Sequence, residues 1–267
     1  MILGAIVGDT VGSIYEFDNV KREDFAFLTP ESTFTDDSVM TLAVANALME
    51  TFEGRRPISD ALVDSMRDLG NGYPGRGYGG NFAAWLYSET GHPGPYNSWG
   101  NGSAMRVSPV GWACDSIEAA EIVAAETAKV THNHVEGIRG AQVTAACVLL
   151  ARQGATNDEI RETVQTRYGY GLDFTLDEIR PGYTFDVSCQ GSVPQAIEAF
   201  LESDGFEDAV RKAVSIGGDS DTIGAIAASI AQGRYGVPRQ IEDDVRNRLA
   251  PELLDINDRF CSIYEVR

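Results

Sequence analysis

The stretch Gly217-Gly218-Asp219-Ser220-Asp221-Thr222-Ile223-Gly224 opens an alanine-rich apolar run late in the chain. Its two glycines allow a backbone turn that side chains would obstruct, and Asp219 lies where helix N-caps favour aspartate. Inside a regular helix, Asp219 and Asp221 would point about 200° apart. Both carboxylates can therefore aim at one point only if the turn precedes the helix, and the glycines supply that turn.

A second acidic stretch, Thr35-Asp36-Asp37-Ser38, stands just before another helical run, residues 39–48. It also places hydroxyl and carboxylate oxygens at a helix start. Hard divalent cations such as Mg²⁺ take oxygen ligands, so these side chains could bind metal. Each stretch taken alone, however, is typical of an ordinary helix N-cap. The two stretches together favour a site for a pair of ions. The predicted ligands are Thr35, Asp36, Asp37, Asp219, Asp221 and Thr222.

Five motifs follow one another along the chain. They are Gly8-Asp9-Thr10-Val11-Gly12 with Glu16, Thr35-Asp36-Asp37-Ser38, Asn101-Gly102-Ser103-Ala104-Met105-Arg106, Thr131-His132, and Gly217 to Thr222. In this order they resemble the motifs of the ADP-ribosylglycohydrolase family, which includes the dinitrogenase reductase-activating glycohydrolases. The resemblance implies an all-α fold, a compact orthogonal multi-helix bundle. It also implies two Mg²⁺ or Mn²⁺ ions and cleavage of ADP-ribose from a modified acceptor.

The resemblance implies roles for individual residues as well. Glu16 would lie beside the metals and the scissile bond, as a catalytic residue together with Asp36 and Asp219. The loop Asn101-Gly102-Ser103 would hold the diphosphate or the nearby ribose, and His132 would contact the substrate. From the sequence alone, Glu16 is more typical of a solvated helix end, and the loop is equally consistent with a tight turn capped by serine.

Asp9 lies within residues 2–17, an apolar stretch with small residues between its large ones, which predicts a closely packed helix. An unpaired buried carboxylate is costly, so we expect Asp9 to hold a neighbouring backbone group or hydroxyl rather than a metal. Further helices are predicted over residues 58–69, 81–88, 116–130, 137–153, 157–169, 193–201 and 206–214, and from about residue 104 with an interruption at Pro109. Residues 168–185 are aromatic and irregular.

Composition limits the remaining possibilities. With 267 residues and 43% hydrophobic content, one core and a single domain over residues 1–267 are expected. A net charge of −19 argues against a nucleic-acid surface. Four cysteines without CxxC spacing, and an apolar N-terminus without a basic leader, predict a cytoplasmic protein with reduced thiols and no membrane segment. The expected partner is an ADP-ribosylated protein or small molecule.

Cleavage of a glycosidic bond needs an attacking water and a protonated leaving atom, while charge develops toward an oxocarbenium ion. Two metal ions can hold the ribose hydroxyls and activate water, and without them four clustered aspartates would repel one another. Glu16 would orient the substrate or transfer a proton.

Three interpretations remain open at the level of sequence. The first is hydrolysis of ADP-ribosyl linkages, N-linked to arginine or O-linked to serine or another hydroxyl. The second is hydrolysis of a free ADP-ribose derivative or nucleotide metabolite, which would use the same metal residues. The third is a non-catalytic ADP-ribose-binding or crystallin-like protein, and the intact acidic set argues against it.

Overall fold

The computed structural model describes residues 2–52, 56–264 and 266, and within these residues it contains fifteen helices and no strand. The helices are α1 (Leu3–Gly12), α2 (Asp36–Phe52), α3 (Ile58–Gly72), α4 (Gly80–Leu86), α5 (Gly102–Met105), α6 (Ser108–Ala113), α7 (Ile117–Lys129), α8 (Val135–Arg152), α9 (Asn157–Arg167), α10 (Leu176–Ile179), α11 (Cys189–Leu201), α12 (Phe206–Ser215), α13 (Ser220–Tyr235), α14 (Arg239–Arg246) and α15 (Pro251–Ile263). The predicted all-α class is therefore confirmed.

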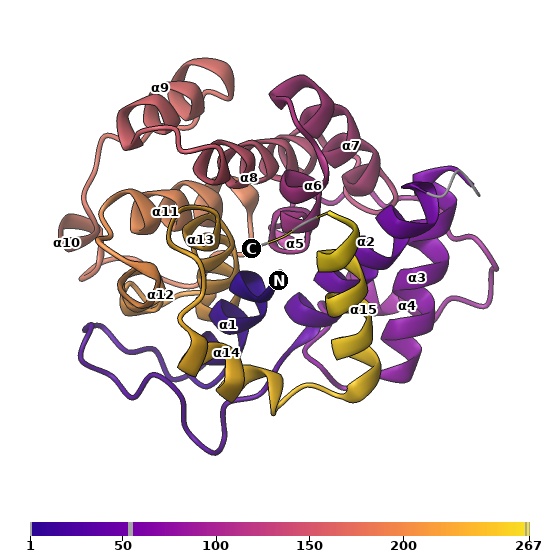
Figure 1. Cartoon of the computed structure of the whole chain (residues 1–267), viewed down its shortest axis with the longest axis horizontal. Coiled ribbons are helices and arrows are strands. Elements are labelled where there is room, and N and C mark those ends of the chain that lie inside the picture. The colour runs from indigo at the N-terminus through magenta and orange to yellow at the C-terminus, as the bar shows by residue number, and fades with distance from the viewer. Residues whose placement is uncertain (1, 53–55, 265, 267) are drawn as a thin grey trace.

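Helices α1 and α13 pack against each other through their backbones (Figure 1). Gly4, Gly8 and Gly12 are spaced by four residues and so lie on one face of α1. A Cβ atom on Gly8 would stand 2.1 Å from the carbonyl oxygen of Gly224, and Gly4 and Gly12 meet the α13 backbone in the same way. Any larger residue at these positions would push the helices apart. This contact places the end of α1 beside the start of α13.

The other helices enclose this pair. Helices α8, α11 and α12 contact α13, whereas α2 contacts α1 and is itself covered by α3, α6 and α15. Nearly every residue of α13 up to Gln232 is buried, as are most residues of α8, which is the pattern of helices surrounded by protein. Among the described residues, no helix has the length and hydrophobicity needed to cross a membrane.

Helix α11 begins at Cys189, before the predicted start at residue 193, and three further predictions differ from the observed structure. The first helix ends at Gly12 rather than near residue 17, so Glu16 lies in the bend that follows it. Pro109 does not interrupt a helix but stands in the first turn of α6, where its missing N–H has no partner to lose. Residues 168–185 include the short helix α10, which is stabilised by a capping box from Thr175 and Glu178.

Candidate active site

Three carboxylates from two segments meet at the seam between α1 and α13. Glu16, Asp219 and Asp221 each offer an oxygen, and these oxygens lie within 4.8 Å of one another. Gly217 and Gly218 have φ angles of 71° and 77°, so the predicted glycine turn does precede α13. Asp219 is the N-cap residue, but its side chain makes no capping bond and instead accepts from Asn101 Nδ2 at 2.6 Å. The turn thus directs Asp219 into the site rather than onto its own helix.

The first turn of α2 adds two further carboxylates, Asp36 and Asp37, which line the same cleft. Asp37 Oδ2 accepts a hydrogen bond from Thr222 Oγ1 at 3.3 Å, so the two acidic stretches are in direct contact. Asp37 Oδ1 is buried and has no hydrogen-bond partner among the described residues. A buried carboxylate oxygen without a partner is costly. A divalent cation with oxygen ligands is therefore the kind of group that fits this site.

Asp9 holds the acidic stretch Thr35-Asp36-Asp37-Ser38 in place. The carboxylate is fully buried and accepts from Thr35 N at 2.9 Å, from Thr35 Oγ1 at 2.8 Å and from Ser38 N at 3.0 Å, and the Ser38 hydroxyl donates to it as well. The expectation that Asp9 binds backbone and hydroxyl groups is confirmed. Because Asp9 belongs to α1 and Thr35 precedes α2, this bond network fixes the start of α2 against α1.

Burial and mutual repulsion raise the pKa values of the whole cluster. Burial, followed by the charges of Asp221 and Asp9, raises the pKa of Glu16 to about 8. Burial and the charge of Asp221 raise the pKa of Asp9 to about 7. The pKa values of Asp36, Asp37 and Asp219 lie well above the ordinary range, with burial as the main cause and Asp221 as the next. Bound cations would remove this repulsion between the carboxylates. This agrees with the earlier observation that the oxygen ligands of the site suit a divalent cation.

A cleft of about 470 Å³ opens above these carboxylates. Of the residues predicted to form the site, its wall contains Glu16, Asp36, Asp37, Asn101, Gly102, His132, Asp219, Asp221 and Thr222. Two predicted residues do not line it. The Thr35 hydroxyl donates to Asp9, and the buried Ser103 hydroxyl donates to the carbonyl of Gly137 at 2.7 Å. The Ser103 side chain supports the wall from behind, whereas the Thr35 hydroxyl also lies within hydrogen-bonding range of Asp221 and so faces the carboxylate cluster.

The glycine loop Asn101-Gly102-Ser103, predicted to hold the diphosphate or the nearby ribose, leads into a very short helix. Helix α5, which follows it, has only four residues, so its dipole offers little to an anion. The close neighbour of the loop is His132, because a Cβ on Gly102 would stand 3.3 Å from His132 Nε2. Phe82 and Tyr96, which the sequence left without a role, also line the cleft.

A chain of hydrogen bonds favours one tautomer of His132. Arg106 is fully buried, and its Nη2 donates to Thr131 Oγ1 at 2.8 Å. Thr131 Oγ1 lies 2.7 Å from His132 Nδ1. Because a guanidinium only donates, the threonine oxygen accepts from Arg106, and its one proton is available for Nδ1. In that arrangement the ring proton of a neutral His132 resides on Nε2, which faces Gly102.

The pKa of His132 supports this assignment. Burial, and then the positive charge of Arg106, hold it well below the ordinary value, so the ring is neutral. His132 thus presents an N–H donor to the cleft. Sequence reasoning gave Arg106 no function, and the only signal for it was its place at the end of the motif that begins at Asn101.

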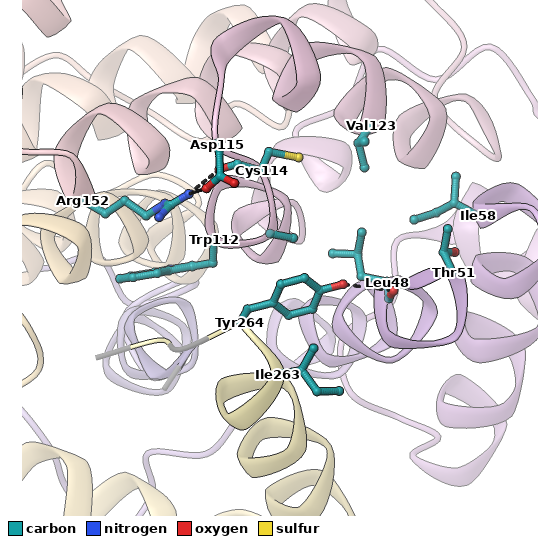
Figure 2. A pocket seen from close by; sticks show the side chains of 11 residues that line it. Leu48, Thr51, Ile58, Trp112, Cys114, Asp115, Val123, Arg152, Ile263 and Tyr264 are labelled. Atoms are coloured by element: carbon teal, nitrogen blue, oxygen red, sulfur yellow. Dashed lines mark hydrogen bonds and ion pairs between the residues drawn. The ribbon is translucent and has the colours of Figure 1, made fainter. Parts of the chain in front are cut away.

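A second hollow of about 580 Å³ lies between the ends of α2, α6, α8 and α15 and the middle of α7 (Figure 2). Its polar side chains are already engaged. Arg152 Nε donates to the carbonyl of Gly111 at 2.9 Å, Arg152 also pairs with Asp115, and Tyr264 Oη donates to the carbonyl of Leu48 at 3.2 Å. This hollow therefore lacks the unpaired oxygen ligands of the carboxylate cleft, although it is larger.

Comparison with known proteins agrees with this geometry. The family model described as ADP-ribosylglycohydrolase matches residues 1–267, and the chain belongs to this family. A solved structure titled "ADP-ribosylglycohydrolase-related protein complex" superimposes with a TM-score of 0.71, covers 99% of this chain and 95% of its own, and is 22% identical. The family and the fold that the motifs implied are confirmed, and with them the class of hydrolases acting on glycosyl bonds.

Several curated proteins are similar over most of their length. The ADP-ribosylarginine hydrolase Tri1 of Pseudomonas putida (strain GB-1) is 28% identical over 95% of this chain and 76% of its own. The ADP-ribosylhydrolase ARH3 of Mus musculus is 25% identical over 88% and 83%. The ADP-ribosyl-[dinitrogen reductase] glycohydrolase of Rhodospirillum rubrum is 26% identical over 88% and 84%.

Proposed function

We propose that this protein hydrolyses the glycosidic bond between ADP-ribose and a modified acceptor, using two divalent cations, Mg²⁺ or Mn²⁺. The observation that carries the proposal is the meeting of both acidic stretches in one cleft, with the buried oxygen Asp37 Oδ1 left without a partner among the described residues. The ligands would be Thr35, Asp36, Asp37, Asp219, Asp221 and Thr222. When bound, the cations would polarise ribose hydroxyls and lower the pKa of a water molecule.

The protein side chains position the substrate around this centre. Asn101 Nδ2 holds Asp219 at 2.6 Å and so fixes one carboxylate oxygen. His132 offers its Nε2–H to an oxygen of the substrate, and Gly102 leaves room for the substrate because it has no side chain. Asp36 and Asp219 face the space where the ribose would lie. These groups orient the anomeric carbon before the bond breaks.

Glu16 is the carboxylate best placed to transfer a proton. It belongs to neither acidic stretch, it lines the cleft, and it is half-buried whereas Asp37, Asp219 and Asp221 are buried. Its place within 4.8 Å of oxygens of Asp219 and Asp221 favours this role over that of a solvated helix end. A glutamate in this place can take a proton from water or give one to the leaving atom of the acceptor.

The activity is tested with two ADP-ribosylated peptides, one linked through arginine and one through serine. Each is incubated with the protein in Mg²⁺, in Mn²⁺ and in excess chelator, and free ADP-ribose is measured. We expect release in the presence of either metal and none with chelator. Absence of release from both peptides under every condition would contradict the proposal.

Titration calorimetry with Mg²⁺ or Mn²⁺ tests the metal centre independently. Two sites per chain are expected, and one site or none at saturating metal would contradict the binuclear centre. The variant Glu16→Gln should lower kcat by about 10²–10⁴ and keep both metal sites. Glu31→Gln, in an exposed part of the same loop, is the matched control and should retain full activity.

A further inference from the structure

An exposed aromatic pair stands beside the mouth of the cleft. The Phe17 ring stacks on the Phe185 ring with centroids 6.1 Å apart and an interplanar angle of 22°. Phe17 is 86% exposed and Phe185 is 48% exposed. Phe185 lines the cleft together with Val187, and Phe17 directly follows Glu16, a half-buried carboxylate of the cluster. The pair therefore lies where the cleft opens to solvent.

The backbone that carries Phe17 is held in place although its ring is exposed. Asn19 Nδ2 donates to the carbonyl oxygens of Tyr15, Glu16 and Gly218 at 2.6, 2.9 and 3.1 Å. Gly218 N donates to Asn19 Oδ1 at 2.8 Å in return. Asn19 thus ties the segment containing Phe17 to the turn before α13.

The segment that carries Phe185 is anchored as well. Tyr183 Oη donates to the carbonyl of Gly191 at 2.6 Å, and Ser188 N donates to Asp186 Oδ1 at 2.8 Å. The carbonyl of Val187 accepts from Asn101 N at 2.8 Å, which joins this segment to the glycine loop of the cleft. Two large apolar rings on fixed backbones, next to a cleft, form a prearranged contact surface.

The charges around the pair indicate what this surface would contact. Asp18 and Asp186 flank the two rings in sequence and are exposed, and neither forms an ion pair in the part of the chain that the structure describes. The nearby cation Lys21 is engaged, because it donates to the carbonyls of Tyr183 and Ile216. Aromatic faces beside carboxylates suit a cationic side chain. A second copy of this chain would instead bring like charges together.

We propose that Phe17, Asp18, Phe185, Asp186 and Val187, here called the acceptor rim, receive the polypeptide that carries the ADP-ribosyl group. The rim favours a segment with a lysine or arginine beside the modified residue. This inference rests on the proposed function, since the acceptor leaves through the mouth of the cleft. It assigns recognition of the protein part of the substrate to residues outside the metal site.

The test compares substrates of one linkage: a peptide with basic neighbours, a peptide with neutral neighbours, and the free ADP-ribosylated amino acid. Phe17→Ala should raise KM for the basic peptide by about fivefold to thirtyfold, the loss expected for one desolvated cation–π contact. It should leave kcat unchanged, and KM for the free amino acid should stay within twofold. Phe17→Tyr, which keeps the ring, should restore the peptide KM.

Two further variants sharpen the comparison. Asp18→Asn combined with Asp186→Asn should remove the preference for the basic peptide at low salt, with a smaller effect at high salt. Ile122→Ala removes an apolar side chain that is 67% exposed on α7 and lies outside the cleft, and it should change none of the constants. Thermal unfolding of Phe17→Ala, Phe17→Tyr and Ile122→Ala should match the unsubstituted protein because these side chains are exposed. The amide oxygen of Asp186→Asn can still accept from Ser188 N, so this variant should remain folded as well.

The possible failures are distinguishable. If the unsubstituted protein releases ADP-ribose from none of the substrates, the proposed function fails and this inference fails with it. If it cleaves all three and Phe17→Ala leaves the peptide KM within twofold, or raises KM equally for the free amino acid, the function stands and the acceptor rim is wrong. Sedimentation showing a dimer that Phe17→Ala dissociates would also overturn the inference.

Discussion

Asp9 offers a direct test of how the fold holds the acidic stretch Thr35-Asp36-Asp37-Ser38. Its carboxylate is fully buried in α1 and accepts from the backbone N–H groups of Thr35 and Ser38 and from both of their hydroxyls. Asp36 and Asp37 lie between these two residues. Removing the carboxylate should therefore change the stability of the protein and its affinity for metal together.

The expected loss follows from the number of donors that would be left without an acceptor. In Asp9→Ala the N–H groups of Thr35 and Ser38 both lose their acceptor, and each unsatisfied group costs about 1–3 kcal/mol. The free energy of unfolding should fall by about 2–6 kcal/mol, in the lower part of that range because Thr35 is only part-buried.

Asp9→Asn should cost less. Its amide oxygen can occupy the place of Oδ2 and still accept from both N–H groups, and its NH₂ group can donate to Thr35 Oγ1 once that hydroxyl turns round. We therefore expect a loss below about 2 kcal/mol. The order of the two variants, with alanine worse than asparagine, depends only on this hydrogen-bond geometry.

Urea unfolding in excess chelator measures the stability of both variants, and calorimetry with Mg²⁺ measures affinity. Metal affinity should fall about 10–100-fold in Asp9→Ala, as found for residues that orient metal ligands. Asp68→Ala, at an exposed site on α3, is the control and should stay within about 0.5 kcal/mol. If Asp9→Ala unfolds within about 1 kcal/mol of the unsubstituted protein and binds Mg²⁺ normally, the positioning role of Asp9 is refuted.

Gly8→Ala should destabilise the protein by about 1–3 kcal/mol or more, whereas Gly72→Ala, with open space around its position, should stabilise by roughly 0.5–1 kcal/mol; equal unfolding midpoints would contradict the backbone contact. In ¹⁵N-histidine NMR spectra, His132 should show the neutral Nε2–H tautomer, and Thr131→Val should yield a mixture of tautomers. Without metal, the pKa values of Glu16 (about 8) and Asp9 (about 7) are raised, so these groups bind protons more tightly in the folded state than in the unfolded chain. Their contribution to the stability of the protein is therefore present at low pH and is lost as the pH rises through about 7–8. The melting temperature in chelator should accordingly fall from about pH 5 to about pH 8, and a melting temperature that is flat or rises would contradict the repulsion among the carboxylates.

The features that could be predicted from the sequence are those encoded by neighbouring residues. A glycine pair before an aspartate determines its own turn, and the φ angles of Gly217 and Gly218 agree with that prediction. Asp9 was assigned a structural role because a carboxylate in an apolar stretch needs donors, and Thr35 and Ser38 supply them. In both cases the chemistry of a few residues is sufficient for the prediction, and the rest of the fold need only be compatible with it.

The features that could not be predicted depend on contacts between distant segments. The end of α1 at Gly12 lies against the start of α13, where a Cβ on Gly12 would stand 2.4 Å from the carbonyl oxygen of Ser220, and no local pattern near Gly12 predicts a contact with a segment so distant in the chain. The protonation of His132 requires the buried side chain of Arg106, which comes from a different loop. The stacking of Phe17 on Phe185 joins segments that are far apart in the chain.

The contact between α1 and α13 connects stability to chemistry. Because Gly8 and Gly224 touch through backbone atoms, the two helices have no side-chain layer that could repack, and interiors packed in this way transmit displacement rather than absorb it. Glu16 follows one helix and Asp221 belongs to the other, so a shift at the glycine contact would change the separation of their oxygens. The same close contact brings like charges together, a cost that bound cations would offset. Metal binding should therefore stabilise the fold as a whole, because the ligand set exists only when α1, α2 and α13 are packed together.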